Sequence, residues 1–149
     1  MIKTAVIGLG KMGLSHVAIL GAHPDVDLVA VCDTSSMVLS AFKQYNSKIK
    51  TYDDFNKLYA QETLDAVLIA TPTKLHHTIA KIAIEKGINV FCEKPFTLTL
   101  EQGRELVELV QKKEVVNQVG YHNHFIGTFR EMKRLLKAGI LGELFHFTG

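Results

Sequence analysis

Short apolar runs alternate with stripes of helical spacing along the first 120 residues. The apolar runs predict six strands, at 3–7, 26–32, 49–52, 66–70, 89–92 and 115–120. Between them, apolar residues recur every three or four positions, which predicts helices at 11–21, 38–45, 53–60, 75–83 and 99–112. Asp53 is expected to cap the third helix and Thr99 the fifth. Strands that alternate with helices through short connections indicate an α/β fold with a doubly wound parallel sheet.

The alternation of predicted strands and helices ends after Gly120. Apolar residues of helical spacing predict one more helix, which ends near Gly139, and residues 142–149 resemble the start of a strand. A strand without a partner is an incomplete unit. We therefore expect residues 121–149 to be a connecting helix and the first strand of a second α+β domain whose remainder lies outside this sequence. The alternative is a complete protein with a frayed tail.

Composition and charge narrow the class of protein. Of the 149 residues, 47% are hydrophobic and 21% are charged, and the formal net charge is +2. No run of Lys and Arg is longer than two residues, so nothing indicates a partner that is a nucleic acid or an anionic membrane. The two cysteines, Cys32 and Cys92, end apolar runs and are expected to be buried thiols of a cytoplasmic protein.

A glycine cluster separates the first predicted strand from the first predicted helix. Gly8, Gly10 and Gly13 have the spacing G-x-G-x-x-G, with Leu9, Lys11 and Met12 between them. The first glycine permits a tight turn, the second leaves room for a pyrophosphate, and the third lets the helix approach the sheet. The loop therefore predicts a dinucleotide site, with the phosphates at the amino end of the helix. The alternative is that the glycines only turn the chain.

Asp33 ends the second predicted strand, about twenty residues after Gly13. A carboxylate at this place accepts hydrogen bonds from the ribose hydroxyls of adenosine and repels a 2′-phosphate. The next residues, 34–36, include no Lys or Arg to offset that repulsion. We therefore expect NAD as the cofactor, with NADP disfavoured. The alternative is that Asp33 only caps the next helix.

Two further motifs follow predicted strands. Thr71-Pro72-Thr73 with His76 follows the fourth strand, and Glu93-Lys94-Pro95 follows the fifth. Together with the glycine cluster and Asp33, they resemble the glucose–fructose oxidoreductase, inositol dehydrogenase and rhizopine-catabolism family (Gfo/Idh/MocA) over essentially the whole chain. The resemblance implies an NAD-binding Rossmann domain at 1–120. It also implies an enzyme that transfers hydride between a CH–OH carbon of a sugar or cyclitol and nicotinamide, and a homo-oligomer at full length.

The resemblance assigns roles to these residues. Lys94 is the expected catalytic residue, which contacts the substrate hydroxyl and has a pKa that partial burial beside the nicotinamide lowers. Glu93 is expected to steady Lys94 or to face the nicotinamide ribose. The remaining cofactor-binding residues that the resemblance implies are Thr71, Pro72, Thr73 and His76. Helical phase lets only one of His76 and His77 face the cleft. His16 is expected to be structural.

One stretch departs from the family pattern. His122, Asn123 and His124 stand where the family has basic residues. Asn123 remains a candidate contact to the nicotinamide or the substrate, and no metal site is expected. The resemblance also implies an acid and a histidine that serve as general base in the second domain, outside this sequence, so we expect this chain to bind NAD without catalysing the reaction. Alternatives are an NAD-dependent glycosidase of the same family, a non-catalytic NAD-binding regulatory module, and a methyltransferase.

Overall fold

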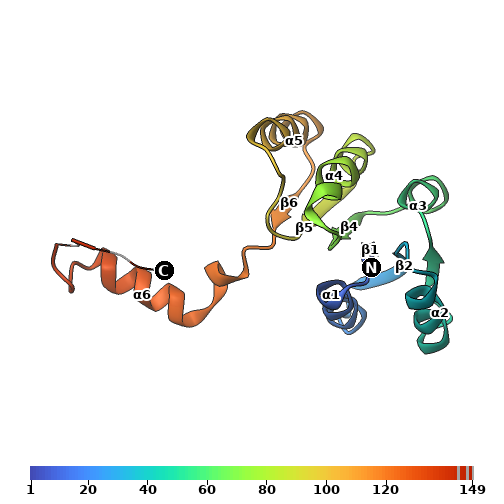
Figure 1. The fold of residues 1–149 in the computed structure, drawn as a ribbon, viewed down its shortest axis with the longest axis horizontal. Coiled ribbons are helices and arrows are strands. Elements are labelled where there is room, and N and C mark those ends of the chain that lie inside the picture. The colour runs from blue at the N-terminus through green and yellow to red at the C-terminus, as the bar shows by residue number, and fades with distance from the viewer. Residues whose placement is uncertain (144, 147, 149) are drawn as a thin grey trace.

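The structure is a computed structural model that describes residues 1–143, 145–146 and 148. Six parallel strands form one sheet in the order β3-β2-β1-β4-β5-β6 (Figure 1). The strands are β1 (Ile2–Ile7), β2 (Val26–Cys32), β3 (Lys50–Tyr52), β4 (Ala66–Ile69), β5 (Asn89–Cys92) and β6 (Asn117–Val119). All six strands that the apolar runs predict are therefore confirmed, and β3 and β6 are each three residues long.

Helices cover both faces of the sheet. They are α1 (Lys11–Gly21), α2 (Ser36–Tyr45), α3 (Phe55–Gln61), α4 (His76–Glu85) and α5 (Leu100–Lys113). The helices α1 and α2 pack on one face, and α3, α4 and α5 pack on the other (Figure 1). Short 3-10 turns precede α4 (η1, Thr73–Leu75) and follow β6 (η2, His122–Phe125). This arrangement confirms the doubly wound α/β fold.

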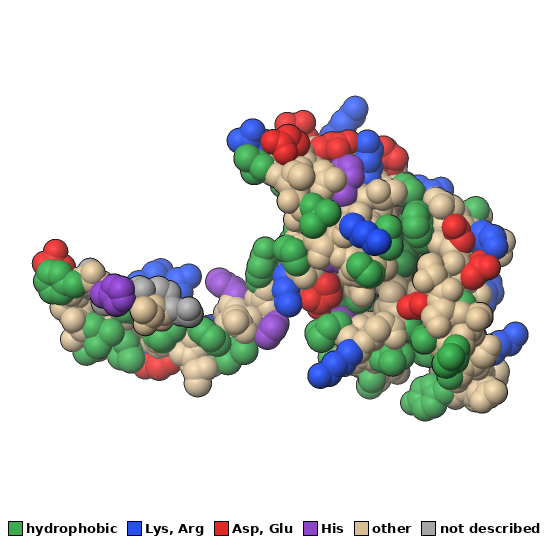
Figure 2. All heavy atoms as spheres, viewed as in Figure 1, with side chains coloured by type: hydrophobic (Ala, Val, Ile, Leu, Met, Phe, Trp, Pro, Cys, Tyr) green, Lys and Arg blue, Asp and Glu red, His purple; other side chains and the backbone are tan. Residues whose placement is uncertain are grey.

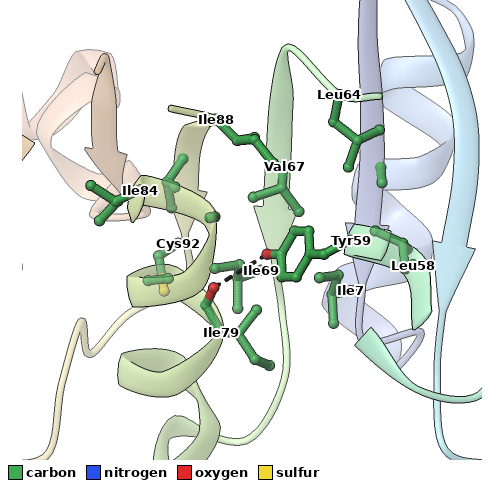
Figure 3. Packing of buried hydrophobic residues seen from close by; sticks show 14 of the residues in the cluster. Ile7, Leu58, Tyr59, Leu64, Val67, Ile69, Ile79, Ile84, Ile88 and Cys92 are labelled. Carbon is green, nitrogen blue, oxygen red and sulfur yellow. Dashed lines mark hydrogen bonds between the residues drawn. The ribbon is translucent and has the colours of Figure 1, made fainter. Parts of the chain in front are cut away.

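Alternate residues of the central strands supply the two layers of the core. Val67 and Ile69 of β4 face α4 and pack in a cluster with Ile79, as Figure 3 shows, whereas Leu68 faces α1 and α2. Burying each aliphatic side chain of this size stabilises the fold by about 1.5–3 kcal/mol. The Tyr59 hydroxyl donates a hydrogen bond to the Ile79 carbonyl oxygen at 3.2 Å, so this buried polar group is satisfied.

The strand order fixes where a ligand binds. β1 pairs with β2 on one side and with β4 on the other, so the chain winds outward in opposite directions from β1 and β4. The loops at the carboxyl ends of these two strands diverge and leave a crevice. In open α/β sheets this topological switch point is where ligands bind.

The cap of α3 corrects one prediction. Asp54, and not Asp53, is the N-cap, because Asp54 Oδ1 accepts hydrogen bonds from the backbone N–H groups of Asn56 at 2.7 Å and Lys57 at 3.2 Å. Asp53 lies one residue too early and pairs instead with the Lys57 ammonium at 2.9 Å. Two adjacent acids are equal candidates in the sequence, and only the backbone geometry chooses between them.

Loss of this cap gives a measurable stability change. Asp54→Ala is expected to lower the free energy of unfolding by about 1 kcal/mol, because two helix N–H groups lose their acceptor. Asp53→Ala, next to it, removes no cap and should leave the unfolding midpoint unchanged within error. Urea denaturation followed by circular dichroism compares the two variants. Equal destabilisation by both would contradict the assignment of the cap.

The segment after β6 stands apart from the sheet. Helix α6 (Gly127–Lys137) confirms the predicted last helix, and none of the described residues from 121 to 148 is buried. Hydrophobic side chains follow one side of this segment (Figure 2). Phe125, Phe129 and Met132 are among its exposed hydrophobic residues. Of the strand expected at 142–149, residues 144, 147 and 149 lie outside the described residues, and the described ones form no strand.

None of the helices in the described part of the chain combines the length and the apolar character that a membrane crossing requires.

Candidate functional site

A cavity of about 560 Å³ opens at the carboxyl ends of β1, β2 and β4. This volume lies in the range of small-molecule and cofactor sites. Many of the residues that the sequence assigns to a cofactor line it together, namely Gly8, Gly10, Lys11, Met12, Asp33, Thr71 and Pro72. The cavity therefore lies at the switch point between β1 and β4 and joins three of the four sequence motifs.

The three glycines each have a distinct reason for lacking a side chain. Gly8 has φ +95°, and a Cβ there would lie 2.6 Å from the Ala70 carbonyl oxygen. A Cβ at Gly13 would lie 1.8 Å from the Gly8 carbonyl oxygen, so only glycine lets α1 approach the loop this closely. A Cβ at Gly10 would meet nothing within 4 Å. The fold thus requires Gly8 and Gly13, whereas Gly10 keeps the mouth of the cavity open.

The amino end of α1 also suits an anion. Gly10 is the N-cap, no side chain caps the helix, and the first turn contains no acidic residue. The first N–H groups of the helix therefore have no side-chain acceptor, and the positive end of the helix dipole lies at the cavity. Backbone N–H groups beside a side-chain-free glycine form a cradle that fits a diphosphate.

Asp33 braces the glycine loop from β2. Its Oδ2 accepts a hydrogen bond from the Leu9 N–H at 2.7 Å, and its Oδ1 accepts one from the Ser35 N–H at 2.8 Å. Asp33 lines the cavity, and each carboxylate oxygen keeps further acceptor capacity for a hydroxyl. Ser35, and not Asp33, caps α2, since the Ser35 hydroxyl accepts from the Val38 N–H. The carboxylate therefore supports the loop and also faces the cavity.

A buried hydroxyl on the β4 side lacks a partner. Thr71 Oγ1 is inaccessible to solvent and makes no hydrogen bond with any described residue. Thr71 lines the cavity with Pro72. A buried hydroxyl without a partner costs free energy unless a ligand satisfies it. Together with the open space at Gly10, this orphaned oxygen shows that the residues present fit a bound dinucleotide.

His76 takes a place that the sequence did not predict. It is 1% exposed, its Nε2 lies 2.8 Å from the Thr71 carbonyl oxygen, and its Nδ1 lies 2.9 Å from the Pro95 carbonyl oxygen. The ring therefore joins the loop after β4 to the loop after β5. Because both nitrogens face backbone carbonyls, the geometry favours a positioning role over the direct cofactor contact expected from the sequence. His77 faces away from this site and pairs with Glu105 at 2.7 Å.

Glu93 lies beneath the loop after β5. Glu93 is 8% exposed, and its Oε1 accepts a hydrogen bond from His16 Nε2 on α1 at 2.8 Å. Its Oε2 accepts one from the Lys94 N–H at 3.2 Å, so Glu93 steadies the backbone of Lys94. His16 also packs edge-on against Phe91, with ring centroids 5.3 Å apart. His16 is thus a partly buried structural residue, as predicted, and it ties α1 to the end of β5.

Lys94 is the second residue after β5 and is exposed. The peptide bond between Lys94 and Pro95 is cis. The partial burial expected for Lys94 is not provided by the described residues, so it would have to come from bound ligands. The two neighbours of Lys94 are both held, Glu93 by His16 and the Pro95 carbonyl by His76. The flexible ammonium therefore projects from a fixed stretch of backbone.

Seven of the fourteen predicted cofactor-binding residues are not in the cavity lining, namely Leu9, Gly13, Thr73, His76, Glu93, Lys94 and Asn123. Leu9 is 3% exposed and packs in the core, so only its N–H takes part, through Asp33. Thr73 lies in η1 outside the cavity lining. Asn123 lies in η2 and lines a separate groove beside α6, so the structure does not bring it to the cavity. The sequence missed Asp53 and Asp54 as lining residues, although they follow β3 as Asp33 follows β2.

Comparisons with known proteins agree with this geometry. The profile of the Gfo/Idh/MocA family, described as an oxidoreductase family with an NAD-binding Rossmann fold, matches residues 2–121. The rhizopine catabolism protein MocA of Rhizobium meliloti is 31% identical over 144 residues, which cover 96% of this chain and 44% of that protein. The NAD(+)-dependent scyllo-inositol 2-dehydrogenase of Bacillus subtilis is 31% identical over 149 residues, which cover 99% of this chain and 44% of that protein.

A solved structure has the same fold. The scyllo-inositol dehydrogenase of Lactobacillus casei, solved with bound NAD(H) and scyllo-inositol, superposes with a TM-score of 0.86 at 25% identity. The match covers 96% of this chain and 43% of that one. The chain therefore spans less than half the length of the proteins that it resembles.

Proposed function

Because the chain belongs to the Gfo/Idh/MocA oxidoreductase family, whose domain here is an NAD-binding Rossmann fold, we propose that it is the cofactor domain of a dehydrogenase. The proposed reaction transfers hydride between a CH–OH carbon of a sugar or cyclitol and nicotinamide. The relatives that are inositol dehydrogenases support this class of substrate. Other relatives include a rhizopine catabolism protein and a D-glucoside 3-dehydrogenase, so the proposal names a class of substrate and not one compound.

One observation carries the proposal. The crevice at the switch point combines an open glycine at a helix amino end with a carboxylate at the end of β2 and an orphaned hydroxyl at the end of β4. The His76 ring contacts the Thr71 carbonyl at the edge of this crevice and the Pro95 carbonyl, which directly follows Lys94. One continuous edge of the sheet thus contains both a place for the dinucleotide and a candidate catalytic ammonium.

The residues of this chain have separate roles in the proposed reaction. The N–H groups of the glycine loop bind the diphosphate, and Asp33 accepts hydrogen bonds from the adenosine ribose. NAD, when bound, supplies the hydride acceptor. Lys94 donates a hydrogen bond to the substrate oxygen and holds or relays its proton. Glu93 keeps the Lys94 backbone in place, and His76 fixes the loop on the other side.

We propose that residues 121–149 begin the domain that completes the substrate site. The apolar side of α6 is exposed, which is expected of a helix whose partner surface lies elsewhere. The same proposal includes a homo-oligomer formed through that second domain. A cytoplasmic location fits the two buried cysteines, Cys32 and Cys92, which are both free thiols.

Calorimetric titration of the chain with NAD tests the proposal. We expect one NAD per chain, bound with a dissociation constant in the micromolar range. S-adenosylmethionine, the ligand of the methyltransferase alternative, should give no heat of binding. A chain that binds S-adenosylmethionine, or that does not bind NAD at millimolar concentration, would refute the proposed function.

A further inference from the structure

We propose that Asp53 is a second specificity-determining residue, which acts with Asp33 to exclude NADP from the cavity. This inference rests on the proposed NAD site and names a residue at its adenosine end. Asp53 follows β3 and lines the same cavity as Asp33 and the glycine loop. The side chain is exposed and caps no helix, so the fold gives it no other evident task than its pair with Lys57.

The register of the sheet places Asp33 and Asp53 at neighbouring positions. Cys32, the last residue of β2, is level with Tyr52, the last residue of β3. The Asp33 N–H donates a hydrogen bond to the Tyr52 carbonyl oxygen at 3.1 Å, so the pairing continues to the very edge of the sheet. Asp33 and Asp53 are the next residues on two parallel neighbours and emerge at the same edge.

Negative charge is concentrated at this end of the cavity. Burial, together with the nearby charges of Asp54, Asp33 and Asp53, raises the pKa of the Cys32 thiol to about 12. The three carboxylates thus surround the end of β2. Asp33 and Asp54 each accept hydrogen bonds from backbone N–H groups of other residues, whereas Asp53 accepts one from the Lys57 ammonium. A phosphate on the adenosine ribose would face all three charges.

Asp53 also binds the Lys57 ammonium, which could otherwise pair with a phosphate. Its Oδ1 accepts a hydrogen bond from the Lys57 ammonium at 2.9 Å, one turn along α3. That hydrogen bond and the charge of Lys57 lower the pKa of Asp53, so the carboxylate stays ionised at neutral pH. Both side chains are more than half exposed, so the pair is readily exchanged for another partner. Without Asp53, Lys57 is free to pair with a phosphate.

Calorimetry of single and combined variants tests the inference. The variants are Asp33→Asn, Asp53→Asn and their combination, each titrated with NAD and with NADP. We expect Asp33→Asn alone to raise the affinity for NADP about tenfold, and Asp53→Asn to add about another tenfold in that background. Adding Lys57→Met should remove most of the second gain. The matched control is Asp27→Asn, which removes the same charge from the opposite end of β2 and should change neither affinity.

The outcomes separate this inference from the proposed function. If Asp53→Asn raises the NADP affinity of the Asp33→Asn variant less than twofold, or no more than Asp27→Asn does, the role of Asp53 is refuted. NAD binding by the unaltered chain would still support the proposed function. If the increase in NADP affinity on adding Asp53→Asn is the same with Lys57→Met as without it, Asp53 does not act by holding the Lys57 ammonium. An unaltered chain that binds neither dinucleotide would overturn the proposed function and this inference with it.

Discussion

Replacing Gly10 with valine will abolish NAD binding and leave the fold intact. The Cβ position at Gly10 projects into open space, with no heavy atom of the protein within 4 Å of it, so we expect the domain to accommodate the valine. It would occupy the mouth of the cavity, where the diphosphate of a dinucleotide needs to approach the backbone. We expect the dissociation constant for NAD to rise by more than about 100-fold, as for the loss of close backbone contacts to a charged ligand.

Two other glycines of the same helix make the comparison specific. Gly21→Val, at the far end of α1, also adds a side chain in open space and should bind NAD normally. Gly13→Val should instead unfold the domain, because its Cβ would lie 1.8 Å from the Gly8 carbonyl oxygen. Calorimetry measures binding, and thermal denaturation measures stability. If Gly10→Val binds NAD as the unaltered chain does, the diphosphate does not lie at this loop.

Lys94→Met will remove hydride transfer without removing the cofactor. Lys94 lies outside the cavity lining, so we expect NAD to bind with an unchanged dissociation constant. In the protein with its second domain, kcat should fall by about 10²–10⁴, the usual contribution of general acid–base catalysis. Stopped-flow absorbance of NADH formation with an inositol or a sugar measures the rate. The control is Lys86→Met, at the end of α4, which should retain full activity.

The alternatives differ in this same assay. An NAD-dependent glycosidase oxidises its substrate transiently, so it would cleave a glycoside without net formation of NADH, and Lys94→Met would slow the cleavage. A regulatory module that only senses NAD would show no turnover, and Lys94→Met would change nothing. Net, substrate-dependent formation of NADH that Lys94→Met leaves intact would contradict the catalytic role of the ammonium.

The fold could be predicted from the sequence because its signals are local. Each central strand is a short apolar run bounded by glycine, proline or aspartate, and each helix shows an apolar stripe of its own. The sites of Gly8, Gly10 and Gly13 could be predicted for the same reason, since the turn, the open mouth and the close packing all lie within six residues. Asp33 followed from its position at a strand end.

The remainder of the site depends on contacts between distant segments. His76 contacts carbonyl groups that lie 5 and 19 residues away in the chain, so nothing in its own neighbourhood indicates that both ring nitrogens are occupied. His16 and Glu93 are 77 residues apart, and only the pairing of β1, β4 and β5 brings them together. The prediction of Asp53 as a helix cap is wrong because the sequence does not show which of two adjacent acids the backbone uses.

Asn123 illustrates a different limit. Its place beside family-specific positions suggested a contact to the cofactor or the substrate, but the chain turns away from the sheet after Gly120. Asn123 lines a groove with basic residues of α6, among them Arg130 and Lys133. The position of Asn123 relative to the cavity depends on this turn of the chain, which the family pattern does not encode.

A crystal structure of the chain with NAD is the most direct test that one edge of the sheet serves both cofactor and catalysis. We expect density for the diphosphate at the turn between β1 and α1, the adenosine ribose against Asp33, and the nicotinamide on the side of the Lys94 ammonium. Density that placed the dinucleotide in the groove between α1 and α2, or that placed the nicotinamide away from Lys94, would contradict it.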